Sequence, residues 1–261
     1  LGVLLGVGLL SACGSSNPPD VTGPGGSAEP VFTPRDQPPP GEWRKGDMHV
    51  HTDHSNDGSF LRQGLDDRAP GNTGVADQIG FATLNGLDFL PLTDHRTWVQ
   101  HYNPDWESSQ LLLIPGEEAN GNPHTTIFGH VDNINQGRVP ENVPRWITLQ
   151  QSIWDAHSQG AVYTIAHPDR SIFNIGDGSV EDWAFAVGYD LAEAWNRAQD
   201  VDAQFQFADD RWNRGYRFGI TASSDNHFKE LWLLAGPGTP HTGVLTAANS
   251  ERATLDGLRA G

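Results

Sequence analysis

The sequence predicts an α/β protein built around a parallel sheet or a barrel. Short apolar runs alternate with segments of helical spacing along most of the chain, which is the order of elements that parallel sheets require. A length of 261 residues is enough to bury one substantial core. Histidine and carboxylate side chains repeatedly lie at or just after the ends of the predicted strands. Ligands in such folds collect at the carboxyl edge of the strands, so this pattern indicates one shared site.

The first thirteen residues have the pattern of a bacterial lipoprotein signal peptide. Residues 1–10 form an apolar run that is too short to span a membrane but fits a signal peptide. Leu10-Ser11-Ala12-Cys13 then resembles a lipoprotein cleavage site, which implies cleavage before Cys13 and lipid attachment to its sulfur. The alternative is a buried apolar strand with an incidental cysteine. The chain lacks an initiating methionine, and a helical pattern at 250–261 stops abruptly, so we expect the natural protein to extend beyond both ends.

Residues 14–42 are predicted to be a flexible, partly extended tether. They are rich in Gly, Pro and Ser and have almost no periodic apolar pattern. The folded domain is expected to span residues 43–261. Together these features predict a lipid-anchored protein of the bacterial cell envelope, facing the periplasm or the exterior, whose contact with the membrane is through the anchor alone.

Composition narrows the range of functions. The net charge of −17 argues against a general nucleic-acid binder, because phosphate contacts need clustered Lys and Arg. Cys13 is the only cysteine, which excludes an intrachain disulfide. Several of the eleven histidines lie beside Asp or Glu, and this combination directs attention to metal binding.

The predicted elements begin with a strand at 46–52, followed by a polar loop. A helix at 75–85 has apolar residues at Val75, Ile79, Ala82 and Leu84, and Gly86 is placed to end it. A buried strand follows at 87–92, although Pro91 counts slightly against a central position in the sheet.

The second half of the chain repeats this alternation. A capping box opens a helix at 148–158, which Gly160 ends, and a polar helix containing Phe205, Phe207 and Trp212 ends at Gly215. Further strands are predicted at 111–114, 125–128, 161–165, 189–195 and 217–221.

The first chemical motif is the pair His49 and His51. Alternate residues of a strand share one face, so both imidazoles project to one side while Met48 and Val50 project to the other. Two imidazoles followed by a turn with a carboxylate suit a divalent metal ion. A polar strand edge with exposed histidines is the alternative, so further ligands downstream must decide.

Four more motifs follow in order: Thr93-Asp94-His95, Pro115-Gly116-Glu117-Glu118, Ala166-His167-Pro168 and Ser224-Asp225-Asn226-His227. With the first motif they resemble those of the PHP (polymerase and histidinol phosphatase) metallohydrolase superfamily. Trp195-Asn196-Arg197 and residues 212–215 are most similar to its CehA/McbA branch. The resemblance runs from about residue 43 to the C-terminus. It implies a distorted seven-stranded (β/α) barrel in a single domain.

The resemblance also implies a centre of two or three divalent ions. Its ligands would be His49, His51, Asp57, His95, Glu118, His124, His167, Asp225 and His227. One ion would take His49, His51, Glu118 and Asp225. A second would share Glu118 and add His124 and His167. A third would use Asp57, His95 and His227. This mixture of nitrogen and oxygen ligands suits Mn, Fe or Zn and does not choose among them.

Two of these assignments have alternatives. The family pattern Gly-x-Glu selects Glu118, and Glu117 is then an exposed or neighbouring carboxylate. The histidine that follows is assigned to His124, with His130 as the alternate.

The carboxylate of the first turn is assigned to Asp57, while Asp53 and His54 remain possible. Asp94 is a candidate catalytic residue, with an equally good interpretation as a residue that orients a ligating imidazole or closes a turn.

Three arginines adjoin the motifs. Arg96, Arg170 and Arg197 are candidates for binding an anionic group of the substrate through paired contacts, and surface salt bridging is the alternative for each. Arg170 is also a candidate catalytic residue. Trp98 and Trp195 adjoin motif residues and are candidates for lining the substrate pocket, whereas His157 is expected to be a surface or packing residue.

The sequence therefore predicts a metal-dependent phosphoesterase acting on small organic esters through a metal-activated hydroxide. No serine or cysteine nucleophile is required, since the chain has no GxSxG motif and its one cysteine precedes the domain. A CehA-like aryl ester or carbamate hydrolase is the second hypothesis, and a non-catalytic metal-binding surface lipoprotein is the third.

Overall fold

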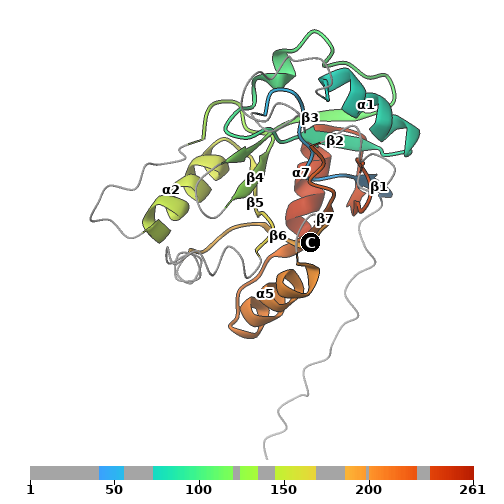
Figure 1. Ribbon diagram of the computed structural model, residues 1–261. Coiled ribbons are helices and arrows are strands. Elements are labelled where there is room, and N and C mark those ends of the chain that lie inside the picture. The colour runs from blue at the N-terminus through green and yellow to red at the C-terminus, as the bar shows by residue number, and fades with distance from the viewer. Residues whose placement is uncertain are drawn as a thin grey trace, which may run out of the picture. The chain divides into compact units, whose positions relative to one another are not determined.

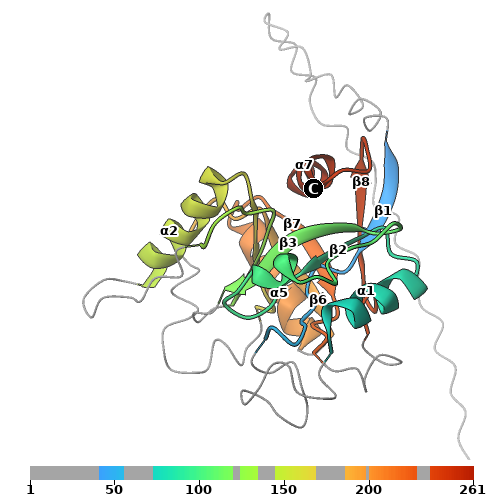
Figure 2. The ribbon, with the colours of Figure 1, turned by 90° about the horizontal axis from the view of Figure 1, so that it is seen from above.

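The computed structural model describes residues 41–55, 73–119, 124–134, 145–168, 186–197, 200–227 and 236–261. These residues form an α/β protein with an eight-stranded sheet in the order β7-β6-β5-β4-β3-β2-β1-β8 (Figures 1 and 2). The strands are β1 (Glu42–Gly46), β2 (Phe89–Leu92), β3 (Leu112–Ala119), β4 (Thr125–Phe128), β5 (Val162–Ile165), β6 (Leu191–Asn196), β7 (Gly219–Ser223) and β8 (Thr242–Thr246). The helices are α1 (Val75–Leu84), the 3-10 helix η1 (Val99–Tyr102), α2 (Arg145–Ser158), α5 (Val201–Asn213) and α7 (Glu251–Ala260).

The sheet is mixed rather than fully parallel. β1, β2 and β3 run parallel, as do β5, β6 and β7. β4 is antiparallel to both of its neighbours, and β8 is antiparallel to β1. The connection from Ala119 to Thr125 is too short for a crossover helix, so β3 and β4 must pair as antiparallel strands.

The two ends of the sheet meet and give it a barrel-like form. The Thr242 hydroxyl of β8 accepts the backbone N–H of Ala222 in β7 and donates to the carbonyl of the same residue, at 2.8 and 2.9 Å. In the segments that follow β1 and β7, Val50 forms an isolated parallel bridge with Asn226. These contacts confirm the predicted α/β barrel class, with one strand more than the seven expected.

An apolar cluster fills the interior of this barrel. It takes residues from the strands and from α7, namely Met48, Phe89, Ile114, Phe128, Val162, Leu191, Val244, Leu255 and Leu258. Helix α7 lies against β3, β5, β7 and β8 (Figure 1). It thus packs against strands from distant parts of the sheet order, and its two leucines cap the interior.

Two further clusters lie outside the barrel. α1 packs through Val75, Ile79 and Ala82 on Leu90 and Leu92 of β2. α2 and α5 pack through Ile153 and Phe207 on the strands around β5. Leu84 was predicted to join the apolar face of α1, but its side chain is 83% exposed. No helix among the described residues is both long and apolar enough to cross a membrane.

Several predicted boundaries were wrong. The first strand ends at Gly46 rather than Thr52, because the buried Asp47 carboxylate accepts the backbone N–H groups of His49, Ser224 and Gly238. Side-chain hydrogen bonds therefore replace a strand ladder there. The expected alternation still holds, since Met48 lies in the interior cluster and Val50 in the cluster beneath α1.

The third strand is longer than predicted, because it continues through Pro115 and Gly116 to Ala119. The Pro115 carbonyl accepts the N–H of Gly129 at 2.8 Å. A Cβ at Gly116 would lie 2.9 Å from the carbonyl oxygen of Leu92. Glycine here permits a close approach of β2 rather than ending the strand. Gly86, Gly160 and Gly215 do follow their helices with positive φ, as predicted.

Candidate metal centre

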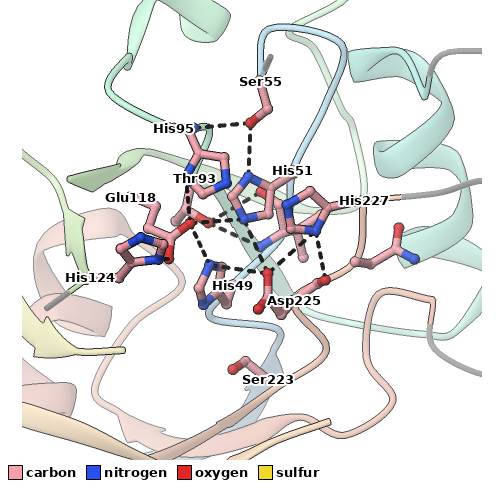
Figure 3. Close-up of polar contacts among 12 residues, drawn as sticks. His49, His51, Ser55, Thr93, His95, Glu118, His124, Ser223, Asp225 and His227 are labelled. Atoms are coloured by element: carbon pink, nitrogen blue, oxygen red, sulfur yellow. Dashed lines mark hydrogen bonds and ion pairs between the residues drawn. The ribbon is translucent and has the colours of Figure 1, made fainter. Parts of the chain in front are cut away.

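Eight of the nine predicted ligands converge at one end of the barrel, where the parallel strands terminate. His49 and His51 lie after β1, His95 after β2, Glu118 in β3, and Asp225 and His227 after β7 (Figure 3). The Val50–Asn226 bridge places the first and last of these segments side by side, with His51 N–H donating to Asn226 and Asp225 N–H donating to His49.

Four buried atoms form the centre of the cluster. His49 Nε2 lies 3.3 Å from Glu118 Oε2 and 3.4 Å from Asp225 Oδ1. His51 Nε2 lies 3.3 and 3.2 Å from the same two oxygens. None of these four buried atoms has a hydrogen-bond partner in the structure.

These spacings fit a metal ion. Two ligands bound to a tetrahedral zinc ion at the usual bond lengths are separated by about 3.3 Å. Burying polar atoms without hydrogen bonds is costly, so four such atoms facing one another indicate that a cation belongs between them. The residues present therefore fit the expected ion.

Glu118 also faces a second group of nitrogen atoms. Its Oε1 lies 2.8 Å from His124 Nδ1 and 3.2 Å from His167 Nε2. Oε2 faces His49 and His51, so the two oxygens of the carboxylate lie against two different pairs of histidines. Glu118 is thus placed to bridge two ions.

A third group comprises His51, His95 and His227, whose donor atoms all lie within 4.8 Å of one another. The His51 and His227 rings stack with centroids 3.8 Å apart. Among the described residues, Asp53 and His54 are in none of the three ligand groups. Asp57, predicted for this group, lies outside the described residues.

The alternation of β3 separates the two neighbouring glutamates. Glu118 faces the centre, whereas Glu117 points to the opposite side, where its Oε2 lies 3.9 Å from His130 Nε2. Burial, with a smaller contribution from His101, lowers the pKa of His130 to about 4. The structure therefore brings Glu118 and His124 to the centre and keeps Glu117 and His130 together away from it.

Neighbouring opposite charges shift the pKa values of the residues at the centre. Burial disfavours the charged imidazole of His49, but the carboxylates of Asp225, Glu118 and Glu193 outweigh it and hold the pKa of His49 well above its usual value. Burial also opposes ionisation of Glu118 and Asp225, yet the charge of His49 keeps the pKa of both carboxyls well below their usual range.

Asp94 supports His51 through a turn. Its buried carboxylate accepts the backbone N–H and the hydroxyl of Thr52, at 2.6 and 2.8 Å, and the hydroxyl of Ser55 at 2.8 Å. Ser55 Oγ in turn lies 2.8 Å from His51 Nδ1. Asp94 thus holds the turn that orients His51.

Glu193 of β6 is a site residue that the motifs did not reveal. It is fully buried, and its Oε1 lies 2.8 Å from His49 Nδ1. The only signal in the sequence is one carboxylate within an otherwise apolar strand, which a buried partner must stabilise.

Backbone geometry also marks the centre. Among the described residues, the non-glycine residues with positive φ are Arg96, His167 and Asp225. Such conformations are unfavourable and collect at functional sites.

Of the three arginines predicted to bind substrate, Arg96 and Arg197 are exposed and directly follow His95 and Asn196 in the sequence, while Arg170 lies outside the described residues.

Comparison with known proteins supports the fold. No protein-family model and no curated protein matches the chain. The structure is similar to that of a two-domain Bacteroides vulgatus protein containing a predicted PHP-like metal-dependent phosphoesterase, with a TM-score of 0.55 and 16% identity. That similarity covers 84% of this chain and 63% of the other.

Two further structures show weaker similarity. A predicted metal-dependent phosphoesterase of Bifidobacterium adolescentis gives a TM-score of 0.49 at 16% identity, covering 82% of this chain and 95% of the other. An amidohydrolase of Chromobacterium violaceum, solved with sulfate and no metal, gives 0.47 at 14% identity, covering 69% and 87%. The similarity to the Bacteroides protein shows a PHP-like α/β fold, and the described residues include three groups of buried or half-buried candidate metal ligands.

Proposed function

We propose that this protein is a metal-dependent hydrolase that cleaves phosphoester bonds of small organic substrates. The observation that carries the proposal is the set of four facing donor atoms of His49, His51, Glu118 and Asp225, which are buried and lack hydrogen bonds. The PHP-like fold of the Bacteroides protein adds support.

The candidate ligands are proposed to bind two or three ions. His49, His51, Glu118 and Asp225 would hold one, Glu118 would share a second with His124 and His167, and His51, His95 and His227 would contribute to a third. Divalent ions lower the pKa of bound water and polarise a substrate oxygen. Mn, Zn and Fe all suit these ligands.

The arginines are proposed to bind the substrate's anionic group. Arg96 and Arg197 are exposed and follow His95 and Asn196 directly, so their guanidinium groups can pair with phosphate oxygens. We propose the same role for Arg170. Replacing Arg96 or Arg197 with Ala is expected to raise KM for a phosphoester while leaving metal content unchanged.

An ester panel tests the reaction class. Metal-loaded protein is assayed on p-nitrophenyl phosphate, bis-p-nitrophenyl phosphate and naphthyl acetate. Phosphoester hydrolysis that EDTA abolishes and added Mn or Zn restores supports the proposal. Tight metal binding without turnover of any compound would instead support a non-catalytic metal-binding protein.

A second candidate is an aryl ester or carbamate hydrolase like the CehA/McbA branch. It is favoured by the resemblance of Trp195-Asn196-Arg197 to that branch, and Asn196 Nδ2 donates to Asp225 Oδ2 at 3.1 Å, at the centre itself. Turnover of naphthyl acetate with none of the phosphoesters would select this candidate.

We further propose that the protein is lipid-anchored at the bacterial cell envelope through Cys13. The support is the sequence at residues 1–13 and the Gly-, Pro- and Ser-rich composition of residues 14–42, from which a tether is predicted. Metabolic labelling with a fatty acid should mark the wild type and not Cys13→Ser. Equal labelling of both proteins would overturn this proposal.

A further inference from the structure

Glu193 accepts hydrogen bonds from several of the segments that form the centre. Its Oε1 accepts from His49 Nδ1–H and from the hydroxyl of Ser223. Its Oε2 accepts the backbone N–H of His167 at 2.6 Å and Asn196 Nδ2–H at 3.1 Å. One buried carboxylate thus satisfies four donors from four segments of the chain.

This arrangement fixes the chemical form of His49. A carboxylate offers lone pairs only, so once His49 is neutral, as a metal ligand must be, its imidazole presents Nδ1–H to Glu193 and keeps the lone pair on Nε2. His49 Nε2 is the atom that faces Glu118 and Asp225. A ring nitrogen of His49 also lies within 4.8 Å of ligand atoms of two sets of residues, His51 with Asp225 and Glu118 with His167. The orientation of this single ring therefore affects both.

The same network reaches two other ligands. The bond to the His167 backbone holds a residue whose φ is +25°. Asn196, which donates to Glu193, also donates to Asp225 Oδ2 at 3.1 Å. By contrast, His51 is held by Ser55 and Asp94. The centre thus has two separate supporting networks.

We propose that Glu193 is the positioning residue of the centre, which selects the metal-binding form of His49 and aligns His167 and Asp225 with it. The inference rests on the proposed metal-dependent function but concerns metal binding, so it can be tested without turnover. A hydrogen-bond partner of a ligating histidine typically changes metal affinity by about 10–100-fold when removed.

Glu193→Gln is the informative variant. A glutamine amide has one accepting oxygen and one donating NH2 group, so it can accept hydrogen bonds from only some of the four donors. Glu117→Gln is a matched control, because Glu117 is equally buried but faces away from the centre. Ser223→Ala is a milder variant, since it removes one donor to Glu193 without touching a ligand.

The experiment measures zinc affinity by chelator competition, bound zinc by elemental analysis and, for the Co²⁺-loaded protein, the visible spectrum. Thermal unfolding of each metal-free variant is measured in parallel. We expect an affinity loss of about 10–100-fold and an altered cobalt spectrum in Glu193→Gln, a smaller loss in Ser223→Ala, and wild-type values in Glu117→Gln.

Wild-type zinc affinity and an unchanged cobalt spectrum in folded Glu193→Gln would overturn the proposal. If that variant does not fold, Ser223→Ala decides, and wild-type affinity there would overturn it too. Absence of esterase activity in the wild type would count against the proposed function and leave these measurements intact.

Discussion

At the scale of single residues, the centre depends on buried atoms that lack a hydrogen bond. The Nε2 atoms of His49 and His51, with one oxygen each of Glu118 and Asp225, are buried and face one another without hydrogen bonds. Their separations of 3.2–3.4 Å leave a metal ion as the group that best satisfies them. Each of these residues should therefore be needed for metal binding.

Replacing a ligand should remove both metal and activity. His49→Ala and Asp225→Ala are expected to abolish turnover and to lower metal content, because each removes one of the four facing atoms that would hold an ion. Elemental analysis and initial rates on the ester panel measure the two effects. His157→Ala is the control, since His157 lies on α2 and pairs with Asp190 away from the centre. A ligand variant that keeps full metal content and rate would refute the assignment.

Metal binding should release a proton at neutral pH. The surrounding carboxylates hold the pKa of His49 above its usual value of 6.5, so the metal-free protein carries a proton on His49 at pH 7. An ion needs the neutral imidazole, so it must displace that proton, and its apparent affinity should rise with pH.

Calorimetry in buffers of different ionisation enthalpy measures this release. The observed enthalpy of zinc binding at pH 7 should vary between buffers, with a slope that shows net release of protons. An enthalpy identical in all buffers would contradict this account of His49.

Part of the site could be predicted from single residues and part could not. The paired histidines and the later motifs mark residues that the fold brings together, because the first motif lies in a predicted strand and each later one follows a predicted strand. Glu193 carries no such motif, and only its contact with His49 across 144 residues of sequence reveals it. Asp94 does lie in a motif, and an orienting role was one of its two interpretations, but its three hydrogen bonds to Thr52 and Ser55 depend on tertiary structure.

At the scale of elements, α7 closes the interior that lies beneath the centre. Leu255 and Leu258 are 4% exposed and pack among residues from the strands. The helix is anchored further by Arg259 Nη2, which donates to the carbonyls of Gly160 and Ala161. Its packing should therefore contribute much of the stability of the barrel.

Truncating a leucine of α7 tests this packing. Leu255→Ala is expected to lower the free energy of unfolding by about 2–5 kcal/mol, through lost burial and the cavity left behind. Urea unfolding gives the value. Leu84→Ala, at an 83% exposed position, should change it by less than about 0.5 kcal/mol. Equal effects of the two substitutions would contradict the role of α7.

Strand boundaries were harder to predict than the elements themselves. Pro115 and Gly116 suggest an ending, but the carbonyl of Pro115 still pairs with Gly129 and Gly116 admits β2 closely. β8 (Thr242–Thr246) was not predicted, because a short run with Gly243 and threonines at both ends has little apolar signal. Its role is read from long-range contacts, namely the pairing with β1 and the bond from Thr242 to Ala222.

At the scale of the whole molecule, metal binding should reinforce the closure of the barrel. The candidate ligands come from segments after β1, β2, β5 and β7 and from β3 itself, so bound ions would link strands that are far apart in the sheet order. An ion that binds only the folded chain stabilises it, by an amount that rises with the logarithm of the free ion concentration once that exceeds the dissociation constant.

Removing the metal should therefore destabilise the protein. With free metal at 100 times its dissociation constant, each site adds about 2.7 kcal/mol to the free energy of unfolding. Thermal unfolding before and after EDTA treatment should show a lower Tm for the metal-free protein and recovery when zinc is added. His49→Ala should show a smaller shift, and a Tm that zinc never changes would count against ions that link the strands.

The most direct test of the central claim is the anomalous diffraction of zinc-soaked crystals of the wild type. We expect a peak at about 2 Å from His49 Nε2, His51 Nε2 and the facing oxygens of Glu118 and Asp225. A second peak is expected between Glu118, His124 and His167. Strong zinc peaks elsewhere on the protein, with none among these side chains, would contradict it.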